Sequence, residues 1–384
     1  MSTDAWDMVP LALVAQVTLG KMVQNSTTEL ETVEQPYLHA ANVRDFGVLD
    51  TDHSHRTMWF SPGEVDSLKV KSGDVVVVEG GAVGKSAYVK NDLPGYGFQN
   101  SILRVRAKKR VSDGRFIQYS LQSAYDSGEI SRQCSSVSLA HFPAEKINRF
   151  RIPCPSLETQ QRIADYLDRE TAEIDAAVAD LDRYLDLLNA KLDSTGREIF
   201  ATLSEEWQLI QTKFLVDITT GSGDTQDAKE DGEFPFYVRS DTIQRSDDHE
   251  FDCDAVLTSG DGAGVGKIFH LASGKFKAHQ RVYVMHNFRR VSPEYFYWMF
   301  KSAFPDVIRY GGAKSTVDSV RMPMIANLKL PVPDKSTQEE ISGRLASLYE
   351  EVDSLIAEST KLRDLLLKRR SVLITEVVTG RKQV

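Results

Sequence analysis

The chain has 384 residues, which is enough for two or three domains that each bury a hydrophobic core. Hydrophobic residues make up 41% and charged residues 26%, no apolar run is long enough to span a membrane, and the N-terminus lacks the basic flank of a secretory signal. We therefore expect a cytoplasmic protein without membrane contact. The formal net charge of −9 argues against a generally basic nucleic-acid binder.

The first globular segment, residues 1–155, mixes strand and helix signals. A turn at 71–74 precedes the β-branched run Val75–Val78, which predicts a buried strand, and residues 116–123 predict a short helix. Gln99 and Asn100, whose amides can each form a pair of hydrogen bonds, precede a further strand, and basic residues follow them. This pattern is typical of proteins that contact base edges and phosphates of nucleic acids. The alternative interpretation is that these amides cap the start of a strand and face solvent without binding nucleic acid. The candidate DNA-binding residues are Gln99, Asn100, Arg104, Arg106 and Lys108.

A glycine-rich stretch at 79–86 resembles a phosphate-binding loop, but Glu79 stands where that template requires a glycine. A carboxylate there would repel a nucleotide, so we interpret the stretch as a tight hairpin with Lys85 at its tip, in reach of DNA phosphates. The second half of the chain repeats the pattern, with Asp261 replacing the glycine and Lys267 at the corresponding place.

Residues 156–205 and 334–384 predict two long helices. Apolar residues recur at alternating steps of three and four over several heptads, which favours a coiled-coil seam formed by the two helices, most simply antiparallel. Two helices of an ordinary bundle core are the alternative. Pro155, Ser156 and Asp334 supply start signals. The first helical segment, counted over 151–205, has twelve acidic and six basic residues. The seam residues include Ile163, Leu167, Leu181, Tyr184, Leu188, Ile341, Leu345, Leu355, Leu362 and Leu366.

The second globular segment, residues 206–333, repeats the order of the first. Strands are predicted at 254–258 and 281–284, and a helix rich in aromatic residues at 294–302. Its candidate DNA-binding residues are Lys267, Lys275, Lys277, His279, Gln280 and Arg281.

The phrases that open the two helices match each other. Pro153 and Pro331, and Gln160 and Gln338, share one offset of 178 residues. This period is far too long for a solenoid. It predicts two copies of a domain-plus-helix unit, and therefore two similar binding surfaces.

Catalytic and metal-binding patterns are absent from the sequence. His53 and His55 form an HxH pair without a convincing ligand set around it, and the three cysteines are too far apart for a disulfide framework or a CxxC site. We expect no metal site, no catalytic residue and no enzymatic activity of the chain itself.

Several segments together resemble the specificity subunit of type I restriction–modification systems. They are PYLHAANVRDFGVLD from Pro36, GDVVVVEGGAVGK from Gly73, FQNSILRVR from Phe98, FPFYVRSDTI from Phe234, LTSGDGAGVGKIFH from Leu257, GKFKAHQRVYV from Gly274, the repeated proline–glutamine phrases, and the ending LKRRSVLITEVVTGRKQV. Their order and duplication cover nearly the whole chain.

The resemblance implies an α+β fold. Two target recognition domains with twisted, mainly antiparallel sheets (1–155 and 206–333) would be separated by two long spacer helices (156–205 and 334–384). It further implies a subunit that reads a bipartite, asymmetric DNA target, docks two methyltransferase subunits on the helices, and is joined by restriction subunits. The candidate partner-binding residues on the helices are Ile163, Leu167, Leu181, Leu188, Ile341, Leu345, Leu355 and Leu366. S-adenosylmethionine and ATP are then expected only on those partners. The alternative is a coiled-coil adaptor that binds proteins without touching DNA, and the acidic net charge favours that alternative slightly.

Overall fold

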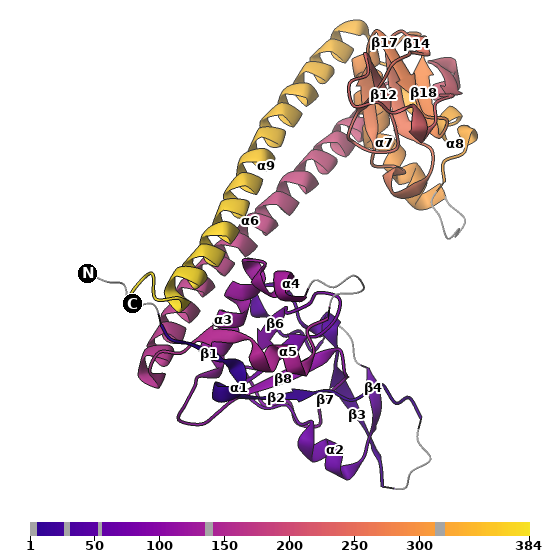
Figure 1. Cartoon of the computed structure of the whole chain (residues 1–384). Helices are drawn as coiled ribbons and strands as arrows, with labels where there is room; N and C mark the ends of the chain where they lie inside the picture. Colours follow the sequence, from indigo (N-terminus) through magenta and orange to yellow (C-terminus); the bar gives the residue numbers. More distant parts are fainter. Residues whose placement is uncertain (1–5, 27–30, 53–55, 135–140, 312–318) are drawn as a thin grey trace. The chain divides into compact units, whose positions relative to one another are not determined.

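A computed structural model of the chain describes residues 6–26, 31–52, 56–134, 141–311 and 319–384. The chain divides into two compact units, residues 1–180 with 362–384 (unit 1) and residues 181–361 (unit 2). Each unit contains one globular domain and part of both long helices, which are drawn in Figure 1 as α6 Leu157–Glu206 and α9 Lys335–Val378. The two long helices that the sequence predicts are present in the structure.

The domain of unit 1 is built on a four-stranded antiparallel sheet of order β2-β8-β5-β6 and a three-stranded sheet of order β4-β3-β7. In the second sheet β3 pairs in parallel with β7. The elements are β1 Met8–Pro10, α1 Leu11–Val14, β2 Ala15–Leu19, β3 Val33–Leu38, η1 Ala40–Asn42, η2 Asp45–Gly47, β4 Thr57–Phe60, α2 Pro62–Ser67, β5 Asp74–Val78, β6 Ser86–Tyr88, β7 Gly97–Phe98, β8 Ile102–Ala107, α3 Gly114–Asp126, α4 Glu129–Cys134, α5 Ala144–Arg149 and β9 Arg151–Pro153.

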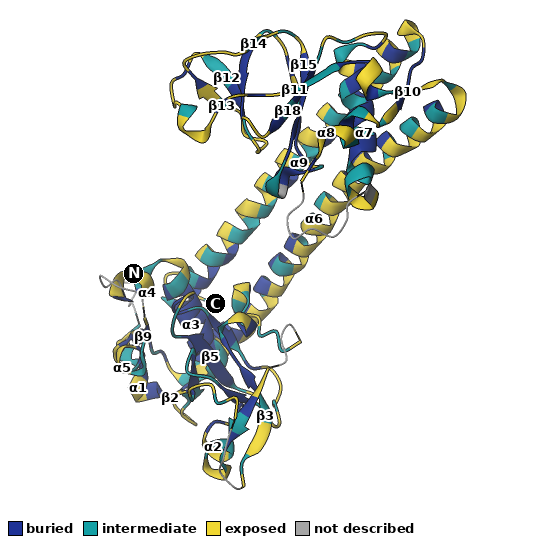
Figure 2. Cartoon of the chain, turned by 90° about the vertical axis from the view of Figure 1, so that its right-hand side faces the viewer, coloured by how far each residue is buried: buried dark blue, intermediate teal, exposed yellow. Residues whose placement is uncertain are grey.

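Strand β5 is buried on both faces, which explains its continuous apolar sequence. Val75 and Val77 join a core with α3, whereas Val76 and Val78 join a separate core beneath the second sheet. Figure 2 shows this strand in the colour of buried residues. The sequence-predicted strand at 75–78 is confirmed.

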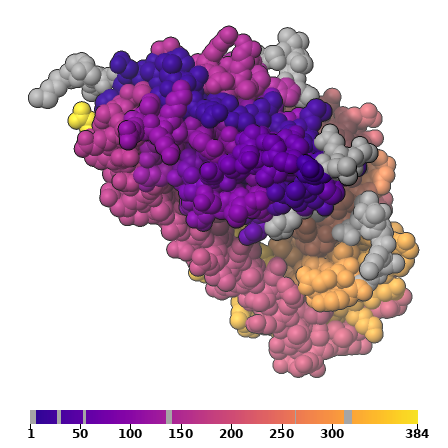
Figure 3. Space-filling model, turned by 90° about the horizontal axis from the view of Figure 1, so that it is seen from below, coloured from indigo at the N-terminus to yellow at the C-terminus, as the bar shows by residue number. Residues whose placement is uncertain are grey.

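Helix α3 lies between the sheet and the long helices. Ile117 and Leu121 pack on the sheet, and Phe116 and Tyr119 pack on α6 and α9. In the space-filling view the indigo-to-purple domain lies directly against the magenta beginning of α6 (Figure 3). The domain and the helix segments of unit 1 therefore share one core.

The domain of unit 2 repeats this topology, with sheets of order β11-β18-β15-β16 and β13-β12-β17-β14. Again one pair, β12 with β17, is parallel. The elements are β10 Leu209–Gln211, η3 Thr212–Phe214, β11 Asp217–Thr220, η4 Thr225–Asp227, β12 Phe234–Tyr237, β13 Gln244–Ser246, β14 Phe251–Asp252, β15 Ala255–Ser259, η5 Gly262–Gly264, β16 Phe269–Ala272, β17 Lys275–Ala278, β18 Val282–His286, α7 Pro293–Gly311, α8 Met322–Ala326 and β19 Lys329–Pro331. The predicted duplication and the α+β fold class are confirmed.

The repeated proline–glutamine phrase has a specific structural role. In each domain the entry strand pairs antiparallel with the strand that precedes the long helix, so that Met8 lies opposite Pro153 and Leu209 lies opposite Pro331. The glutamine on the first turn of the helix then fastens the domain to that helix. The Oε1 of Gln160 accepts from the amide of Asp113 at 3.0 Å, and its Nε2 donates to the carbonyls of Val111 and Pro155.

Gln338 makes the equivalent set of contacts in unit 2. Its Oε1 accepts from the amide of Ser292 at 2.9 Å, and its Nε2 donates to the carbonyls of Arg290 and Pro333. Both glutamine side chains are almost fully buried. The repeat in the sequence therefore marks the junction between each domain and its helix.

In unit 1 the two helices run antiparallel. Lys382, just after α9, donates to the hydroxyl of Tyr166 on α6, while Arg370, further back on α9, pairs with Asp175 further along α6. The apolar contacts of this pair include Ile163, Leu167, Ile174, Leu373 and Ile374. In unit 2, Leu188 and Leu192 of α6 pack with Val352 of α9. Among the described helices, none is long and apolar enough to cross a lipid bilayer.

The seam prediction is wrong at one repeated position. Tyr184 and Leu362, which stand at equivalent places in the two helices, are 40% and 49% exposed. A straight helix turns every 3.6 residues and drifts by about 20° per heptad from a 3.5-residue repeat, so residues extrapolated along a heptad pattern leave the seam. Val178 of α6, which the heptad pattern did not include, is buried in the contact between the two helices in unit 1.

Candidate nucleic-acid interface

The two polar loops singled out from the sequence are structurally equivalent. The amides of Gln99 and His279 each donate to the last residue of a neighbouring strand, at 3.0 and 2.9 Å. The next amides, of Asn100 and Gln280, donate at 2.8 Å to carbonyls of the chain that follows β2 and β11. The structure therefore brings Gln99 and Asn100 together at one site, and His279 and Gln280 together at its counterpart.

Glycines hold each loop against its neighbouring strand. A Cβ at Gly20 would lie 2.2 Å from the carbonyl oxygen of Gln99, and a Cβ at Gly221 would lie 2.0 Å from that of Ala278. No side chain fits at these distances, so both approaches require glycine. The loop backbones are thereby fixed, which is the preorganisation that a recognition surface needs.

The side chains in these loops differ in availability. Asn100 is half-buried and Gln280 is exposed, and neither amide group has a hydrogen-bond partner among the described residues. Gln99 donates through Nε2 to the Ser101 hydroxyl at 2.7 Å. His279 is buried, its Nδ1 accepts from the amide of Arg281, and burial is the main cause that lowers its pKa.

The basic residues predicted around β8 all have partners within unit 1. Arg104 is buried, donates to the carbonyls of Ser67 and Lys69, and has a pKa lowered mainly by burial. The Nε of Arg106 lies 2.6 Å from Asp74. The Nζ of Lys108 donates to the carbonyls of residues 12 and 13. Their contact with DNA stays a prediction, and their positions give them a role in holding loops together.

The sequence predicts Lys85 at the tip of its hairpin, but the residue lies at the base of the hairpin. It directly precedes β6, and its Nζ is 2.7 Å from the carboxylate of Asp45. Lys267 is exposed, in the turn that follows η5. The hairpin loops differ in length, because Val77 pairs with Ser86 whereas Thr258 pairs with Phe269.

The basic residues of unit 2 fall into two groups. Lys275 and Arg281 are exposed, although the guanidinium of Arg281 lies 2.6 Å from Asp261. Lys277 is buried, with its Nζ 2.7 Å from Asp248 and 3.1 Å from Asp227. The structure thus leaves Lys267, Lys275 and Arg281 on the surface and places Lys277 beneath it.

Arg239 was missed in the sequence, and it completes a charge cluster. Its guanidinium and that of Arg281 both donate to Asp261, at 2.8 and 2.6 Å. Partial burial alone would raise the pKa of Asp261, but the two arginine contacts outweigh it and lower the pKa. Arg239 lies more than 20 residues from Asp261 and 40 from Arg281, so no local pattern could have revealed the cluster.

The predicted partner-binding residues of the helices form intramolecular contacts. Ile163, Leu167 and Leu366 belong to the shared core of unit 1, whereas Leu188 and Leu355 pack between the helices of unit 2. Leu345 and Ile341 pack on the core of the second domain, and Leu181 is half-buried. A partner protein would therefore meet other side chains first.

No metal-binding group of three or more suitable side chains exists among the described residues. The HxH pair falls outside them. Within the described ranges, two similar α+β domains each present a polar loop beside a glycine-rich hairpin, and each is followed by a long helix. These features define a protein with a duplicated domain-plus-helix architecture.

A family model described as the type I restriction modification DNA specificity domain matches residues 3–178 and 204–362. The chain belongs to this family, as its sequence segments suggested. The model describes the domain that gives type I restriction–modification systems their DNA specificity, and the relatives of the chain are named as specificity subunits.

Two relatives have names that agree with this membership. The chain is 27% identical over 178 residues to the EcoDI specificity subunit of Escherichia coli, covering 46% of this chain and 39% of that protein. It is 19% identical over 345 residues to the MjaVIII specificity subunit of Methanocaldococcus jannaschii, covering 74% of each. The match to the EcoDI subunit thus spans well under half of that protein's length.

Solved structures share the fold. A chain from a study of complex assembly and conformational transition of the type I system superposes with a TM-score of 0.75 at 15% identity, covering 99% of both chains. The HsdS subunit of Thermoanaerobacter tengcongensis superposes with a TM-score of 0.52 at 14% identity, covering 99% of this chain and 98% of that one.

Proposed function

We propose that the chain reads a bipartite, asymmetric DNA target, with one half bound by each domain. The observation that carries this proposal is the pair of equivalent loops with unlike side chains. Asn100 in one domain and Gln280 in the other occupy the same backbone position, and the side-chain amide of each has no hydrogen-bond partner within the described ranges. Equivalent platforms with different hydrogen-bonding groups would read different base pairs.

The exposed basic residues of unit 2 supply phosphate contacts in this proposal. Lys267, Lys275 and Arg281 reach solvent, and a DNA phosphate would replace Asp261 as the partner of Arg281. In unit 1, a phosphate would likewise replace Asp45 beside Lys85. The buried residues Arg104, Lys277 and His279 would support these loops from within the domain, and Arg106 and Lys108 would do so from nearer the surface.

Salt-dependent DNA binding in the presence of the methyltransferase partner tests the contacts. Changing Lys275 to alanine should weaken binding to all sequences and reduce the salt slope by about one. Lys329→Ala, an exposed lysine on β19, is the matched control and should bind as the wild type does. Absence of any salt-dependent DNA binding by the complex would instead favour the protein-binding adaptor.

A domain exchange tests the independence of the two readers. Replacing residues 206–332 with the equivalent segment of another specificity subunit should change only one half of the methylated motif in host DNA. Methylome sequencing measures this directly. A change in both halves would contradict the proposal that each domain reads its half alone.

We further propose that two methyltransferase subunits dock on the long helices at two equivalent apolar pairs. Tyr184 and Leu187 on α6 are 40% and 63% exposed, and Leu362 and Leu365 on α9 are 49% and 54% exposed. Each pair lies three residues apart on one helix face, and the pairs share the offset of 178 residues. Exposed apolar side chains repeated at equivalent positions are suited to two copies of one partner.

The stoichiometry of the complex tests this docking. Leu187→Glu and Leu365→Glu should each lower the number of bound methyltransferase subunits from two to one, and the double variant should bind none. Native mass spectrometry of the reconstituted complex reports the count. Leu13→Glu, at a 62% exposed leucine on α1, is the control and should still bind two. Two bound subunits in the double variant would refute these docking sites.

The remaining elements of the proposal concern the spacer and the partners. Deleting matched heptads from both helices should shorten the unread spacer while both half-sites are kept, and an unchanged spacer would reject the helices as a ruler. Restriction subunits would join the same cytoplasmic complex. S-adenosylmethionine and ATP would serve those partners, with no catalytic cofactor held by this chain.

A further inference from the structure

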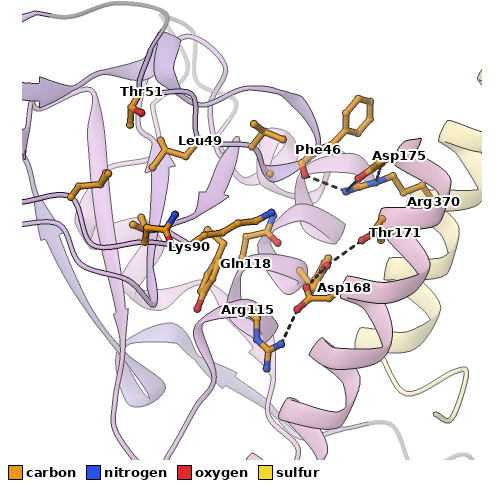
Figure 4. Close-up of a pocket in the computed structure, with 18 residues that line it drawn as sticks. Phe46, Leu49, Thr51, Lys90, Arg115, Gln118, Asp168, Thr171, Asp175 and Arg370 are labelled. Carbon is orange, nitrogen blue, oxygen red and sulfur yellow. Dashed lines mark hydrogen bonds and ion pairs between the residues drawn. The ribbon is translucent and has the colours of Figure 1, made fainter. Parts of the chain in front are cut away.

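Unit 1 contains a cavity of about 580 Å³ that the proposed recognition surfaces do not use. Its walls come from the loop at 46–51, the chain at 88–93 after β6, helix α3, and the facing sides of α6 and α9 within the same unit. Figure 4 shows the lining side chains. The volume lies within the range of small-molecule sites, about 300–1,000 Å³.

One buried side chain in the wall has no partner. Gln118 is 5% exposed and lines the cavity, yet its amide forms no hydrogen bond with any described residue. The hydroxyl of Tyr88 and the ammonium of Lys90 line the same cavity and have no hydrogen-bond partner in the described part of the chain. The amide of Gln118 therefore remains available to an occupant that hydrogen-bonds to it.

The charges around the cavity favour a negative group. The acids that line it are already engaged, because Asp168 accepts from Arg115 and Tyr119 at 2.7 and 2.8 Å, and Asp175 pairs with Arg370. Lys90 is exposed at the rim, and its ammonium forms no ion pair with any residue that the structure describes. Among the polar groups of the lining, Lys90 can only donate, and the amide of Gln118 and the hydroxyl of Tyr88 can each donate to a negative group.

Part of the wall is apolar. Leu49, Val48 and Leu93 line the same cavity, so a ligand with an apolar or planar body would bury surface against them. We propose that this cavity binds a small organic anion, a carboxylate or a phosphate ester, whose charged head meets Lys90, Gln118 and Tyr88. This site is independent of the DNA-reading proposal.

In unit 2, larger side chains occupy the positions equivalent to two residues of this cavity wall. The amides of Asp113 and Ser292 donate to Gln160 and Gln338, and counting from these two amides Gln118 corresponds to Tyr297. Counting from the two glutamines, Thr171 on α6 corresponds to Tyr349 on α9. The rings of Tyr297 and Tyr349 surround the ammonium of Lys301, at 5.5 and 4.2 Å from the ring centres. Smaller side chains at these positions accompany the cavity of unit 1.

Ligand binding to the full-length chain tests the proposal by calorimetry with four probes. AMP and phenylacetate each combine an oxyanion with a planar body and represent the phosphate ester and the carboxylate. Inorganic phosphate lacks the body and adenosine lacks the charge. We expect at least one of the first two to bind with a Kd below 1 mM, and phosphate and adenosine to bind at least about tenfold more weakly, about 1.4 kcal/mol.

Substitutions in the cavity wall test whether the probe binds in this cavity. Lys90→Ala and Gln118→Met should each weaken the bound probe at least about tenfold, and Thr171→Tyr should abolish binding by filling the space. Lys71→Ala, at an exposed lysine of the same domain, is the control. The proposal is overturned if neither AMP nor phenylacetate binds at 10 mM, if phosphate or adenosine binds as tightly, or if Lys90→Ala leaves the affinity unchanged. Lys90 is on the surface, so its variant serves even where the others fail to fold.

Discussion

Replacing Gln160 by methionine should loosen the first domain from its helix while leaving the second domain intact. Methionine keeps the length and volume of the side chain and removes its hydrogen-bonding groups. The change would leave three backbone groups without a partner, the amide of Asp113 and the carbonyls of Val111 and Pro155. The site is 1% exposed, so water cannot readily replace the amide.

The size of the effect follows from these three bonds. A typical intramolecular hydrogen bond contributes about 1 kcal/mol net, and a buried group left unsatisfied costs about 1–3 kcal/mol. The expected loss is therefore about 3 kcal/mol for unit 1, which corresponds to a roughly 100-fold rise in its opening constant. Gln338→Met should have the same effect on unit 2.

Hydrogen–deuterium exchange of the full-length chain separates the two units. The amides of α3 report on unit 1 and those of α7 on unit 2. Gln160→Met should accelerate exchange in α3 roughly 100-fold and leave α7 unchanged. The adjacent Gln161 is exposed, so Gln161→Met is a matched control that should stay within about 0.5 kcal/mol of the wild type. Equal behaviour of the two variants, or acceleration in both helices, would refute the role given to the glutamine.

Three further outcomes test other parts of the molecule. Arg370→Met should lower the free energy of unfolding of unit 1, measured in urea, by about 2 kcal/mol. The reason is that the carboxylate of Asp175 and the carbonyl of Phe46 lose the buried guanidinium that donates to them. Arg369 is exposed, so Arg369→Met should change this free energy little. Gly20→Ala should cost about 1–3 kcal/mol through its backbone clash, and Gly63→Ala, which meets nothing within 4 Å, should be nearly neutral in the same assay. Burial holds the pKa of His270 below its usual 6.5, so the unfolded chain binds a proton at a higher pH than the folded chain does. The stability of the fold is therefore lost as pH falls through 6.5 toward the folded pKa. The urea midpoint should drop between pH 7.5 and pH 5, and it should drop less in His270→Gln.

The repeat, the strand at 75–78 and the heptad pattern were sufficient to predict the duplicated architecture. These signals are local, since a β-branched run or a three-and-four spacing needs no knowledge of distant residues. The availability of the basic residues could not be predicted in the same way. Arg104 and Arg106 stand in a run of positive charge, but their partners, such as Ser67 and Asp74, lie about 30 residues or more away in the chain.

The candidate surfaces were missed for a related reason. Tyr184 and Leu362 satisfy the heptad rule, and only the packing of the helices shows that both face outward. The cavity beside Gln118 arises where a loop, a strand end and three helices meet, so it has no signature along the sequence. Identifying residues that act through contacts between distant parts of the chain thus required the structure.

Strand β5 constrains how such a protein can acquire a new specificity. Its alternating valines belong to two different cores, and Val256 and Leu257 of β15 are divided between cores in the same way. Inserting a single residue into either strand would exchange every side chain between the two cores at once. Mutational drift can therefore remodel the rim of each domain freely, whereas the central strand must be inherited with its register intact.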